Sequence, residues 1–277
     1  MSEVPSLRPV MGRLISVVAS CYLKRPVRVF FDSVWMRQDG RVAVPLKMDL
    51  VHGLATIRSW QPNAADKVDV VGGWWFLHYT PKPNDVVIDV GAGMGEDSLL
   101  FSRLVGEQGR VYSFEAHPFT FLCLDKALKY SQARNTVAVH AAVFAENGTL
   151  QIEDLPVDRW DENSVMCGRE AQGGKLIAVP AITLDDFEPI QQHERIQFLK
   201  MNIEGAEVDA LRGMPKTLAK VEHACIACHD FLADENPRVR TRQTCQRILR
   251  EAGFQVFETP PDSPPWQRDH LHAVRVL

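Results

Sequence analysis

The stretch Val86-Val-Ile-Asp-Val-Gly-Ala-Gly-Met-Gly-Glu96 decides the fold of this chain. Residues 86–90 form an almost continuous apolar run, which predicts a β-strand buried on both faces. The glycines that follow allow a tight turn and a close approach of the backbone to a ligand. From Glu96 to Val105 the apolar residues have helical spacing. A strand, a glycine-rich turn and a helix in this order predict the first unit of an α/β fold.

The same alternation continues along the rest of the chain. Helices are expected at 119–130, from about residue 206, and in the segment that ends at Gly253. This pattern predicts a Rossmann-like, doubly wound and mostly parallel sheet. In such sheets ligands bind beyond the carboxyl ends of the strands, so functional residues are expected directly after strands. Further strands are expected at 110–115, 136–143, 196–203, 223–231, 255–258 and 270–277.

The segment Pro81-Lys-Pro-Asn84 is a structure breaker and marks the expected domain boundary. Residues 1–80 are expected to form an N-terminal extension, and residues 81–277 the main domain with an irregular insertion at 155–182. The insertion is expected to act as a lid over a bound substrate. The extension is expected to hold an amphipathic helix and a β-hairpin, with strands 27–31 and 41–46 around a turn at 38–40. Substrate contacts are also expected in the extension, where Trp60, Trp74 and Trp75 offer stacking surfaces.

Composition narrows the class of protein. The 277 residues carry 31 Lys+Arg and 35 Asp+Glu, a net charge of −4, and 45% of them are hydrophobic. This apolar content excludes disorder as the main state. A mildly acidic chain without a dense basic stripe is a poor candidate for nucleic-acid binding. No apolar run reaches the roughly 18 residues of a membrane span, so a cytoplasmic protein that acts on a small molecule is expected.

The six cysteines are too sparse for a disulfide framework. Cys225-Ile-Ala-Cys228-His229 matches a haem-attachment string, but the stretch has the pattern of a buried strand. Positions three apart on a strand point to opposite faces. Two separate core thiols are therefore expected.

The N-terminal helix has an apolar stripe that runs from Leu7 to Tyr22. Packing against the body of the protein is the first interpretation of this stripe. A homodimer interface and a weak membrane-surface contact through residues 7–25 are the alternatives. Arg8, Arg13, Lys24 and Arg25 flank the stripe.

The residues after the first two strands indicate the charge of the ligand. A dinucleotide fingerprint would place its third glycine at the position of Glu96. A carboxylate there would repel a pyrophosphate and favour a cationic or neutral ligand. Glu115, 20 residues beyond Gly95, ends the second strand and could accept both hydroxyls of a ribose.

Four stretches occur along the chain in a characteristic order: Val87–Gly95, Tyr112–Pro118, Thr183–Phe187 and Leu199–Glu207. Together they resemble the FkbM family of S-adenosylmethionine-dependent methyltransferases, and the resemblance covers about residues 80–257. It implies a seven-stranded sheet whose last strand is antiparallel, and O-methylation of a sugar, glycolipid, polyketide or peptide natural product.

The resemblance also implies roles for single residues. Asp89, Gly91 and Gly93 would line the methionine end of the cofactor, Glu115 would hold its ribose, and Ala142 would lie near the adenine.

One position departs from the family. The family pattern Lys-x-Asp-x-Glu-Gly-Ala-Glu has Asn202 here in place of the aspartate. An asparagine cannot act as a base and is a weaker metal ligand, although it can still position a hydroxyl. Proton removal must then rely on Glu204 or on the end of the next strand.

His229 and Asp230 follow the fifth strand, next to the fourth, and are expected to border the same crevice. His229 is the expected base, with Asp230 and Glu204 in support. Asp230 and Glu204 could instead form a metal pair, but little supports a divalent metal and no metal ligand is assigned. A helix-capping role for Asp230 is the alternative, and for Lys200 a salt bridge to Glu204 or Glu207 is expected.

Two other functions stay open. A nicotinamide-dependent oxidoreductase would share the architecture, but Glu96 speaks against it. A non-catalytic cofactor-binding protein would account for Asn202. N-methylation and carboxylate methylation are also compatible with the cofactor half of the site, and the sequence does not name the acceptor.

Overall fold

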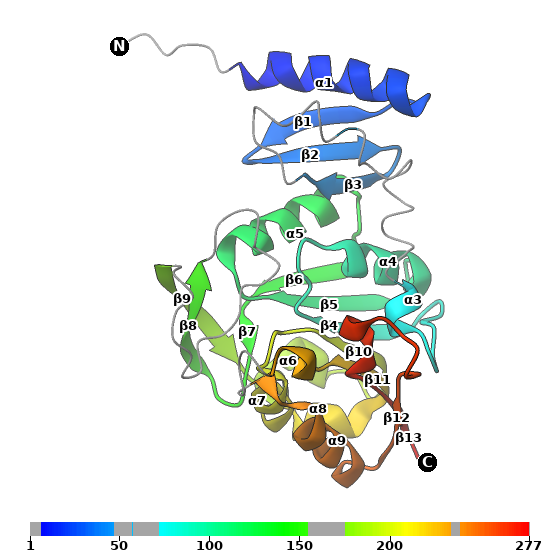
Figure 1. Cartoon of the computed structure of the whole chain (residues 1–277), viewed down its shortest axis with the longest axis vertical. Coiled ribbons are helices and arrows are strands. Elements are labelled where there is room, and N and C mark those ends of the chain that lie inside the picture. Colours follow the sequence, from blue (N-terminus) through cyan, green and yellow to red (C-terminus); the bar gives the residue numbers. More distant parts are fainter. Residues whose placement is uncertain (1–6, 47–56, 58–71, 155–174, 234–238, 277) are drawn as a thin grey trace.

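A computed structural model describes residues 7–46, 57, 72–154, 175–233 and 239–276. Its main element is a seven-stranded sheet with the order β12-β13-β11-β10-β4-β5-β6 (Figure 1). Only β13 runs antiparallel to its neighbours in this sheet. The expected mostly parallel sheet with an antiparallel last strand is thereby confirmed. The strands are β4 (Val86–Val90), β5 (Arg110–Glu115), β6 (Thr136–His140), β10 (Ile196–Met201), β11 (Val221–Ala227), β12 (Phe254–Glu258) and β13 (His270–Arg275).

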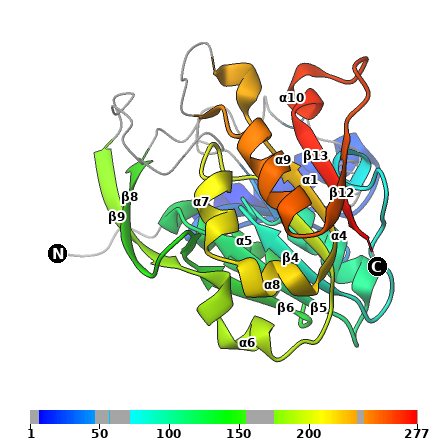
Figure 2. The ribbon, with the colours of Figure 1, turned by 90° about the horizontal axis from the view of Figure 1, so that it is seen from below.

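Helices cover both faces of this sheet, which explains the continuous apolar run of β4. Ile88 and Val90 face a buried cluster with Leu211, Leu218 and Leu249 from one layer of helices. Figure 2 shows α7, α8 and α9 lying across that face. Val87 points the other way, into a cluster that contains Phe101, Val105 and Trp75. The helices are α3 (Gly72–Trp75), α4 (Glu96–Val105), α5 (Pro118–Tyr130), α6 (Glu188–Gln191), α7 (Glu207–Arg212), α8 (Pro215–Lys220), α9 (Arg242–Glu251) and α10 (Pro265–Arg268), with 3₁₀ turns η3 (Leu184–Asp186) and η4 (Asp230–Leu232).

The strand order reverses between β4 and β10, because the chain runs outward through β5 and β6 and then returns to β10. This reversal is where ligands bind in open α/β sheets. The carboxyl ends of the two strands approach each other closely. A Cβ on Gly91 would lie 1.9 Å from the carbonyl oxygen of Asn202, and the φ of Gly91 is +75°. Only glycine fits this position.

The N-terminal extension differs from the expected hairpin. It consists of α1 (Arg8–Leu23) and a three-stranded antiparallel sheet of β1 (Arg28–Asp32), β2 (Val34–Asp39) and β3 (Val42–Pro45). The expected turn at 38–40 joins β2 to β3, and the strand between was missed. The chain reverses at Ser33, which has a φ of +63° and none of the glycine or proline signals that mark such turns. The small sheet lies between α1 and α5 (Figure 1).

The apolar stripe of α1 is only partly buried. Ile15 and Ala19 pack against the small sheet, and a Cβ on Gly12 would lie 2.8 Å from the carbonyl oxygen of Val29. On the outer side the apolar side chains stay exposed, so the expected packing on the body of the protein holds for only part of the stripe. The exposed side chains are Leu7, Val10, Leu14, Val17, Val18 and Tyr22. Among the described residues, no helix combines the length and apolarity of a membrane span.

A third sheet with the order β7-β9-β8 flanks the main one. The segment 175–182, expected to be irregular, is strand β9 (Lys175–Ile182), which pairs with β8 (Gly148–Asp154) along its whole length. The expected third strand, 136–143, is divided at Ala141 into β6 and β7 (Ala142–Val143). The rest of the expected lid, 155–174, and Trp60 lie outside the described residues.

Candidate functional site

The glycine turn after β4 is tied to the end of β5. Gly91, Gly93 and Gly95 all have left-handed φ angles, of +75°, +56° and +100°. The backbone N–H of Gly93 donates to Glu115 Oε2 at 2.9 Å, and the N–H of His117 donates to Oε1 at 2.9 Å. Burial raises the pKa of Glu115 to about 7, even though these two donors favour the charged form. Glu115 therefore lies at the expected edge of the sheet, beside the turn.

The amino end of α4 carries two acidic residues directly after this turn. Gly95 is the residue that precedes the helix, and Glu96 and Asp97 occupy its first turn. Glu96 is half-buried. A helix that binds phosphate presents free backbone N–H groups at its first turn. Here two carboxylates occupy that turn, and their negative charge would repel a phosphate.

A buried ion cluster lies beneath the turn. Lys200 is 1% exposed, and its Nζ lies 2.9 Å from Asp89 Oδ1 and 3.0 Å from Asp97 Oδ2. The same Nζ donates to the carbonyl oxygen of Gly91 at 2.6 Å. Asp89 is fully buried and also accepts from the hydroxyl of Ser98 at 2.6 Å. This cluster holds the first residue of the turn against β10.

The salt bridge expected for Lys200 is therefore wrong in its partners, because Asp89 and Asp97 take the place of Glu204 and Glu207. Burial opposes the charge on Lys200, but the two carboxylates raise the pKa of the ammonium above its ordinary value. Burial also raises the pKa of Asp97, which the charge of Lys200 counteracts. The buried carboxylate of Asp89 thus pairs with Lys200 and Ser98 and positions the turn.

The end of β10 presents two side chains at the strand reversal. The N–H of Asn202 donates to the carbonyl oxygen of Val90, which fastens the two strand ends together. Asn202 Oδ1 is buried and has no hydrogen-bond partner among the described residues. Glu204 has a φ of +53°, a conformation that a non-glycine side chain seldom adopts. Such strain at the edge of a sheet accompanies functional sites.

His229 is held between two carboxylates. Its Nε2 lies 3.0 Å from Glu204 Oε1, and its Nδ1 lies 3.2 Å from Glu207 Oε1. Glu207 is fully buried, and it also accepts from the N–H of Gly205 and from the hydroxyl of Thr241, each at 2.9 Å. The expected neighbours His229 and Glu204 are thus brought together.

The two carboxylates also decide the protonation state of His229. Burial alone would lower its pKa, but Glu204 and Glu207 raise it to about 10. At neutral pH the ring is an imidazolium with both nitrogens engaged, so it has no site for a further proton. This state does not favour the expected role of His229 as the base.

Asp230 was expected to support His229, but its side chain has other partners. Its Oδ1 accepts from the N–H groups of Thr241 and Arg242, each at 2.9 Å, and these begin α9. The capping alternative therefore describes the contacts of Asp230. Ala142, which was expected near the adenine, is buried in a small cluster with Ile152 and Val179.

The Thr183–Phe187 motif has a structural role. The Thr183 hydroxyl caps η3 by accepting from the N–H of Asp186 at 3.2 Å. Asp185 accepts from the N–H groups of Lys216 and Thr217 and so holds the start of α8. Phe187, the last residue of the motif, packs on Phe114 of β5 with ring centroids 5.3 Å apart.

The sequence did not reveal the contacts of two residues of the site, Glu207 and Asp97. Glu207 was expected only as a possible partner of Lys200, and its contact with His229 was missed. Asp97 reaches Lys200 across 103 positions of sequence, and Trp75 Nε1 donates to it at 2.9 Å. Trp75 is buried, so it forms no open stacking surface for a sugar.

A protein-family model described as the methyltransferase FkbM domain matches residues 89–256. The chain is also similar to two curated proteins. Methyltransferase sdnD of Sordaria araneosa is 22% identical over 218 residues, which cover 69% of this chain and 80% of that protein. Methyltransferase 1 of Beauveria bassiana (strain ARSEF 2860) is 24% identical over 204 residues, which cover 67% of this chain and 78% of that protein.

Solved structures have lower similarity. The methyltransferase FkbM of Methylobacillus flagellatus KT is 17% identical with a TM-score of 0.45, and the match covers 72% of this chain. It covers 45% of that protein, so this chain spans less than half of its length. Fibrillarin of Aeropyrum pernix, solved with bound S-adenosyl-L-methionine, is 12% identical with a TM-score of 0.45 and coverages of 76% and 74%.

Proposed function

This chain belongs to the FkbM family of methyltransferases, and from that premise we propose that it transfers a methyl group from S-adenosylmethionine to a hydroxyl of a small molecule. A sugar, a glycolipid, or a polyketide or peptide natural product is the proposed acceptor. The observation that carries the proposal is the grouping of Glu115, Asn202 and the clamp Glu204–His229–Glu207 at the carboxyl ends of β5, β10 and β11.

The residues present fit this cofactor. Glu115 lies beside a glycine turn and is the acceptor that a ribose diol requires. Asn202 Oδ1 is a buried acceptor that lacks a donor among the described residues, and a ligand N–H or O–H would satisfy it. The acidic first turn of α4 favours a cation. When bound, the cofactor supplies a methyl group on a positively charged sulfur, already activated for displacement.

The acceptor hydroxyl must lose its proton as it attacks the methyl group, and a carboxylate of the clamp can accept this proton. Glu204 and Glu207 carry two negative charges, and the imidazolium of His229 carries one positive charge. The group therefore has a net charge of −1 and becomes neutral when it takes one proton. Glu204 is the more exposed carboxylate, with 25% of its side chain accessible against 0% for Glu207. We assign the proton to Glu204 and a positioning role to His229.

The acceptor-side role of Asn202 follows from its chemistry. The amide cannot remove a proton, but it can accept or donate a hydrogen bond. It lies two residues from Glu204 and next to Gly91, at the strand reversal. Asn202 would therefore orient the acceptor hydroxyl, while the alignment of the reacting atoms supplies most of the rate enhancement.

The experiment is methyl transfer from labelled S-adenosylmethionine to a panel of sugars, glycolipids and natural-product alcohols. With an accepted substrate, Glu204→Gln should lower kcat by about 10²- to 10⁴-fold. Asp209→Asn is the matched control, because the side chain of Asp209 forms a surface ion pair with Arg212. Full turnover by Glu204→Gln would reject the assigned base. Transfer to an amine or a carboxylate instead of a hydroxyl would reject O-methylation, and binding without any transfer would favour a non-catalytic protein.

A catalytic metal is not part of the proposal. The Oδ1 atom of Asp230 already accepts from two backbone N–H groups, and Glu204 pairs with His229. Turnover is therefore expected to persist after treatment with EDTA. Loss of turnover that is restored by a divalent cation would contradict this expectation.

A further inference from the structure

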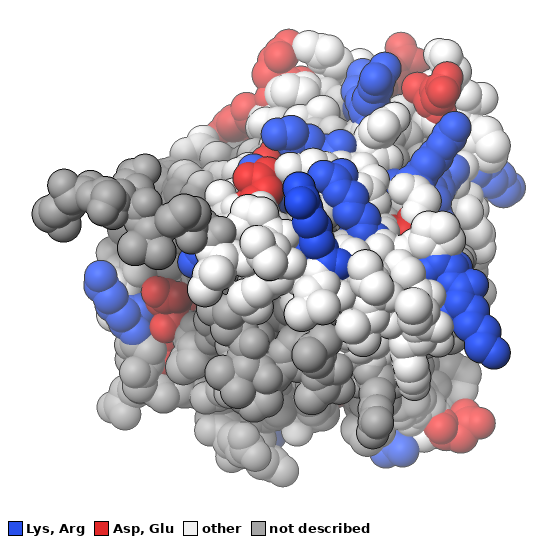
Figure 3. Space-filling model, turned by 90° about the horizontal axis from the view of Figure 1, so that it is seen from above, with Lys and Arg blue, Asp and Glu red and all other residues white. Residues whose placement is uncertain are grey.

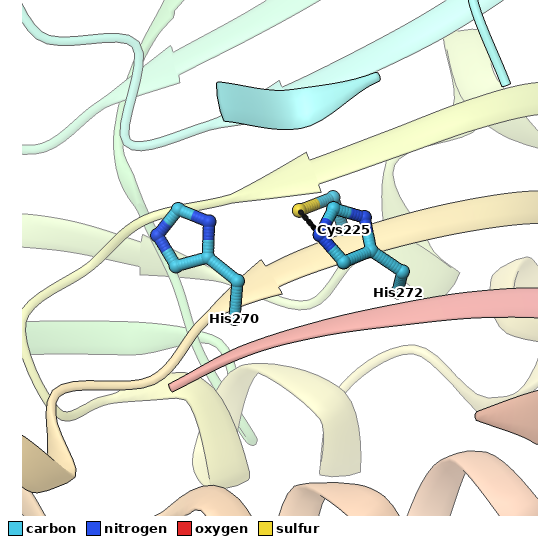
Figure 4. Close-up of side chains that lie close together, drawn as sticks. All are labelled: Cys225, His270 and His272. Atoms are coloured by element: carbon cyan, nitrogen blue, oxygen red, sulfur yellow. Dashed lines mark hydrogen bonds between the residues drawn. The ribbon is translucent and has the colours of Figure 1, made fainter. Parts of the chain in front are cut away.

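Three potential metal ligands lie together on β11 and β13, outside the site described above. Cys225 is the cross-strand partner of His272, and His270 is two residues away on the same strand. Positions i and i+2 of a strand share a face, so both imidazoles and the thiol point to the same side of the sheet. One nitrogen from each ring and the sulfur all lie within 4.8 Å of one another (Figure 4).

The three side chains are buried inside the protein. Cys225 is 0% exposed, and His270 and His272 are each 4% exposed. They border the cluster of Val87, Phe101 and Phe198. Two imidazoles in such a place would be expected to have complete sets of hydrogen bonds, because an unpaired buried polar atom costs about 1–3 kcal/mol.

His270 does not have a complete set. Its ring is hydrogen-bonded to the backbone of Trp74, but Nδ1 is buried and has no hydrogen-bond partner among the described residues. Figure 4 shows a ring nitrogen of His270 on the side of Cys225 and His272. A histidine whose second nitrogen is fastened to the backbone is the usual form of a metal ligand. Trp75 stacks on the same ring, with centroids 5.1 Å apart and planes at 3°.

We propose that Cys225, His270 and His272 bind a transition-metal ion, with Zn²⁺ as the expected occupant. Thiolate and imidazole are the donors that Zn²⁺ prefers, and a tetrahedral ion needs them about 3.4–3.6 Å apart. Cys225 Sγ and His272 Nε2 are 4.0 Å apart, and all three ligand atoms lie within 4.8 Å of one another, so the side chains must draw together when the ion binds. Binding forms the S–Zn bond and releases the thiol proton to solvent. A fourth ligand comes from water or from His78, whose ring is 6.0 Å from that of His272.

This site is separate from the proposed catalytic groups but touches them through Trp75. The Trp75 ring packs on His270, lies 5.2 Å from Lys200 Nζ, and bonds to Asp97 through Nε1. The proposal does not depend on the methyl acceptor or on the base.

The test uses the full-length protein, stripped with a chelator and titrated with Co²⁺, which reports thiolate ligation through a sulfur-to-metal charge-transfer band. One equivalent of Co²⁺ should produce the band, and Zn²⁺ should abolish it. Cys225→Ala should lose the band, and His272→Gln should weaken binding by at least about tenfold. Cys228→Ala is the matched control, because Cys228 is equally buried but belongs to the cluster on the opposite face.

Each outcome decides the proposal. A thiolate band that persists in Cys225→Ala, or a wild-type protein without any band, would overturn it. If the variants fail to fold, the proposal can be tested by thermal unfolding of the wild-type protein with and without Zn²⁺. Zn²⁺ should then raise Tm reversibly, and an unchanged Tm would likewise overturn the proposal.

The exposed face of α1 carries a second, independent inference. Leu7, directly before the helix, and five apolar side chains of α1 are between 39% and 71% exposed. Residues 7–31 contain five Lys or Arg and no Asp or Glu. Figure 3 looks onto this side and shows Lys and Arg side chains beside an uncharged stretch of surface. The opposite side of α1 packs on β1, so the helix can present its apolar face only while lying flat.

We propose that this α1 face rests on an anionic membrane surface. A second copy of the chain would bring the same basic side chains together, whereas anionic headgroups would neutralise them. The protein should sediment with phosphatidylserine-containing vesicles but not with phosphatidylcholine alone, and salt should weaken the binding. Val10→Gln, Leu14→Gln and Val17→Gln combined should abolish it. Leu176→Gln, which alters an equally exposed leucine on β9, should not.

Two results would overturn the membrane proposal. One is an absence of sedimentation with anionic vesicles. The other is a concentration-dependent dimer that the triple variant dissociates, because that result would assign the α1 face to a second copy.

Discussion

The clamp Glu204–His229–Glu207 should make the protein less stable as pH rises above neutrality. Glu204 and Glu207 raise the pKa of His229 from 6.5 to about 10. A raised pKa in the folded state contributes stability that is fully present below the unfolded value of about 6.5, and that stability is lost as pH rises through about 10. Replacing His229 by glutamine removes this contribution.

The size of the effect follows from the same shift. A difference of roughly 3.5 pKa units corresponds to about 5 kcal/mol at most. Linkage then gives a contribution of about 4 kcal/mol near pH 7 and about 1 kcal/mol near pH 9. The difference in unfolding free energy between wild type and His229→Gln should therefore shrink by about 2–3 kcal/mol over this interval.

Urea denaturation at a series of pH values measures this difference directly. His140→Gln is the control, because His140 contacts the carbonyl oxygen of Ala116 at 3.1 Å instead of two carboxylates. Its difference from wild type should change less with pH. The unfolding free energy of wild type minus that of His229→Gln could instead stay constant or grow with pH, and this result would show that the two carboxylates do not stabilise the imidazolium. Titration of the His229 ring near pH 7, followed by NMR, would show the same.

Three further outcomes are expected. Gly91→Ala should destabilise the protein by about 3 kcal/mol in urea unfolding because its Cβ would meet Asn202; Gly93→Ala, whose Cβ meets nothing within 4 Å, should cost about 1 kcal/mol, and equal losses would contradict the close approach. Lys200→Met should cost about 3–5 kcal/mol by the same measurement, because it leaves Asp89 and Asp97 buried without a cation; a loss below about 1 kcal/mol would show that the cluster is not needed. Asp230→Ala should lower Tm through a lost cap worth about 1 kcal/mol and leave kcat unchanged, whereas a fall in kcat would return Asp230 to the reacting groups.

The main domain could be predicted because its signals are local. The apolar run 86–90, the glycines after it and the helix from Glu96 are adjacent in sequence, and each restricts the backbone by itself. The antiparallel last strand depended on the family resemblance instead. The strand after Ser33 was missed because its turn uses a left-handed serine without a glycine signal.

The contacts of the site could be predicted less well, because they join distant segments. Glu115 and Glu204 were identified because they follow strands. The partners of Lys200 were wrong because Asp97 comes from α4, which the spacing along β10 does not reveal. The protonation state of His229 depends on its contact with Glu207. Glu204 and Gly205 both have left-handed φ angles, and this turn brings Glu207 next to His229 after β11. A sequence shows that charged groups share an edge of the sheet, but their pairing requires the folded geometry.

We propose that the carboxyl ends of β4, β5 and β10 form a site for S-adenosylmethionine. Calorimetric titration with S-adenosylhomocysteine, compared with NAD, measures the affinity of this site for each ligand. One S-adenosylhomocysteine should bind per chain, more tightly than NAD, and Glu115→Gln should weaken its binding by about tenfold or more. No binding of S-adenosylhomocysteine, or tighter binding of NAD, would overturn the proposed site.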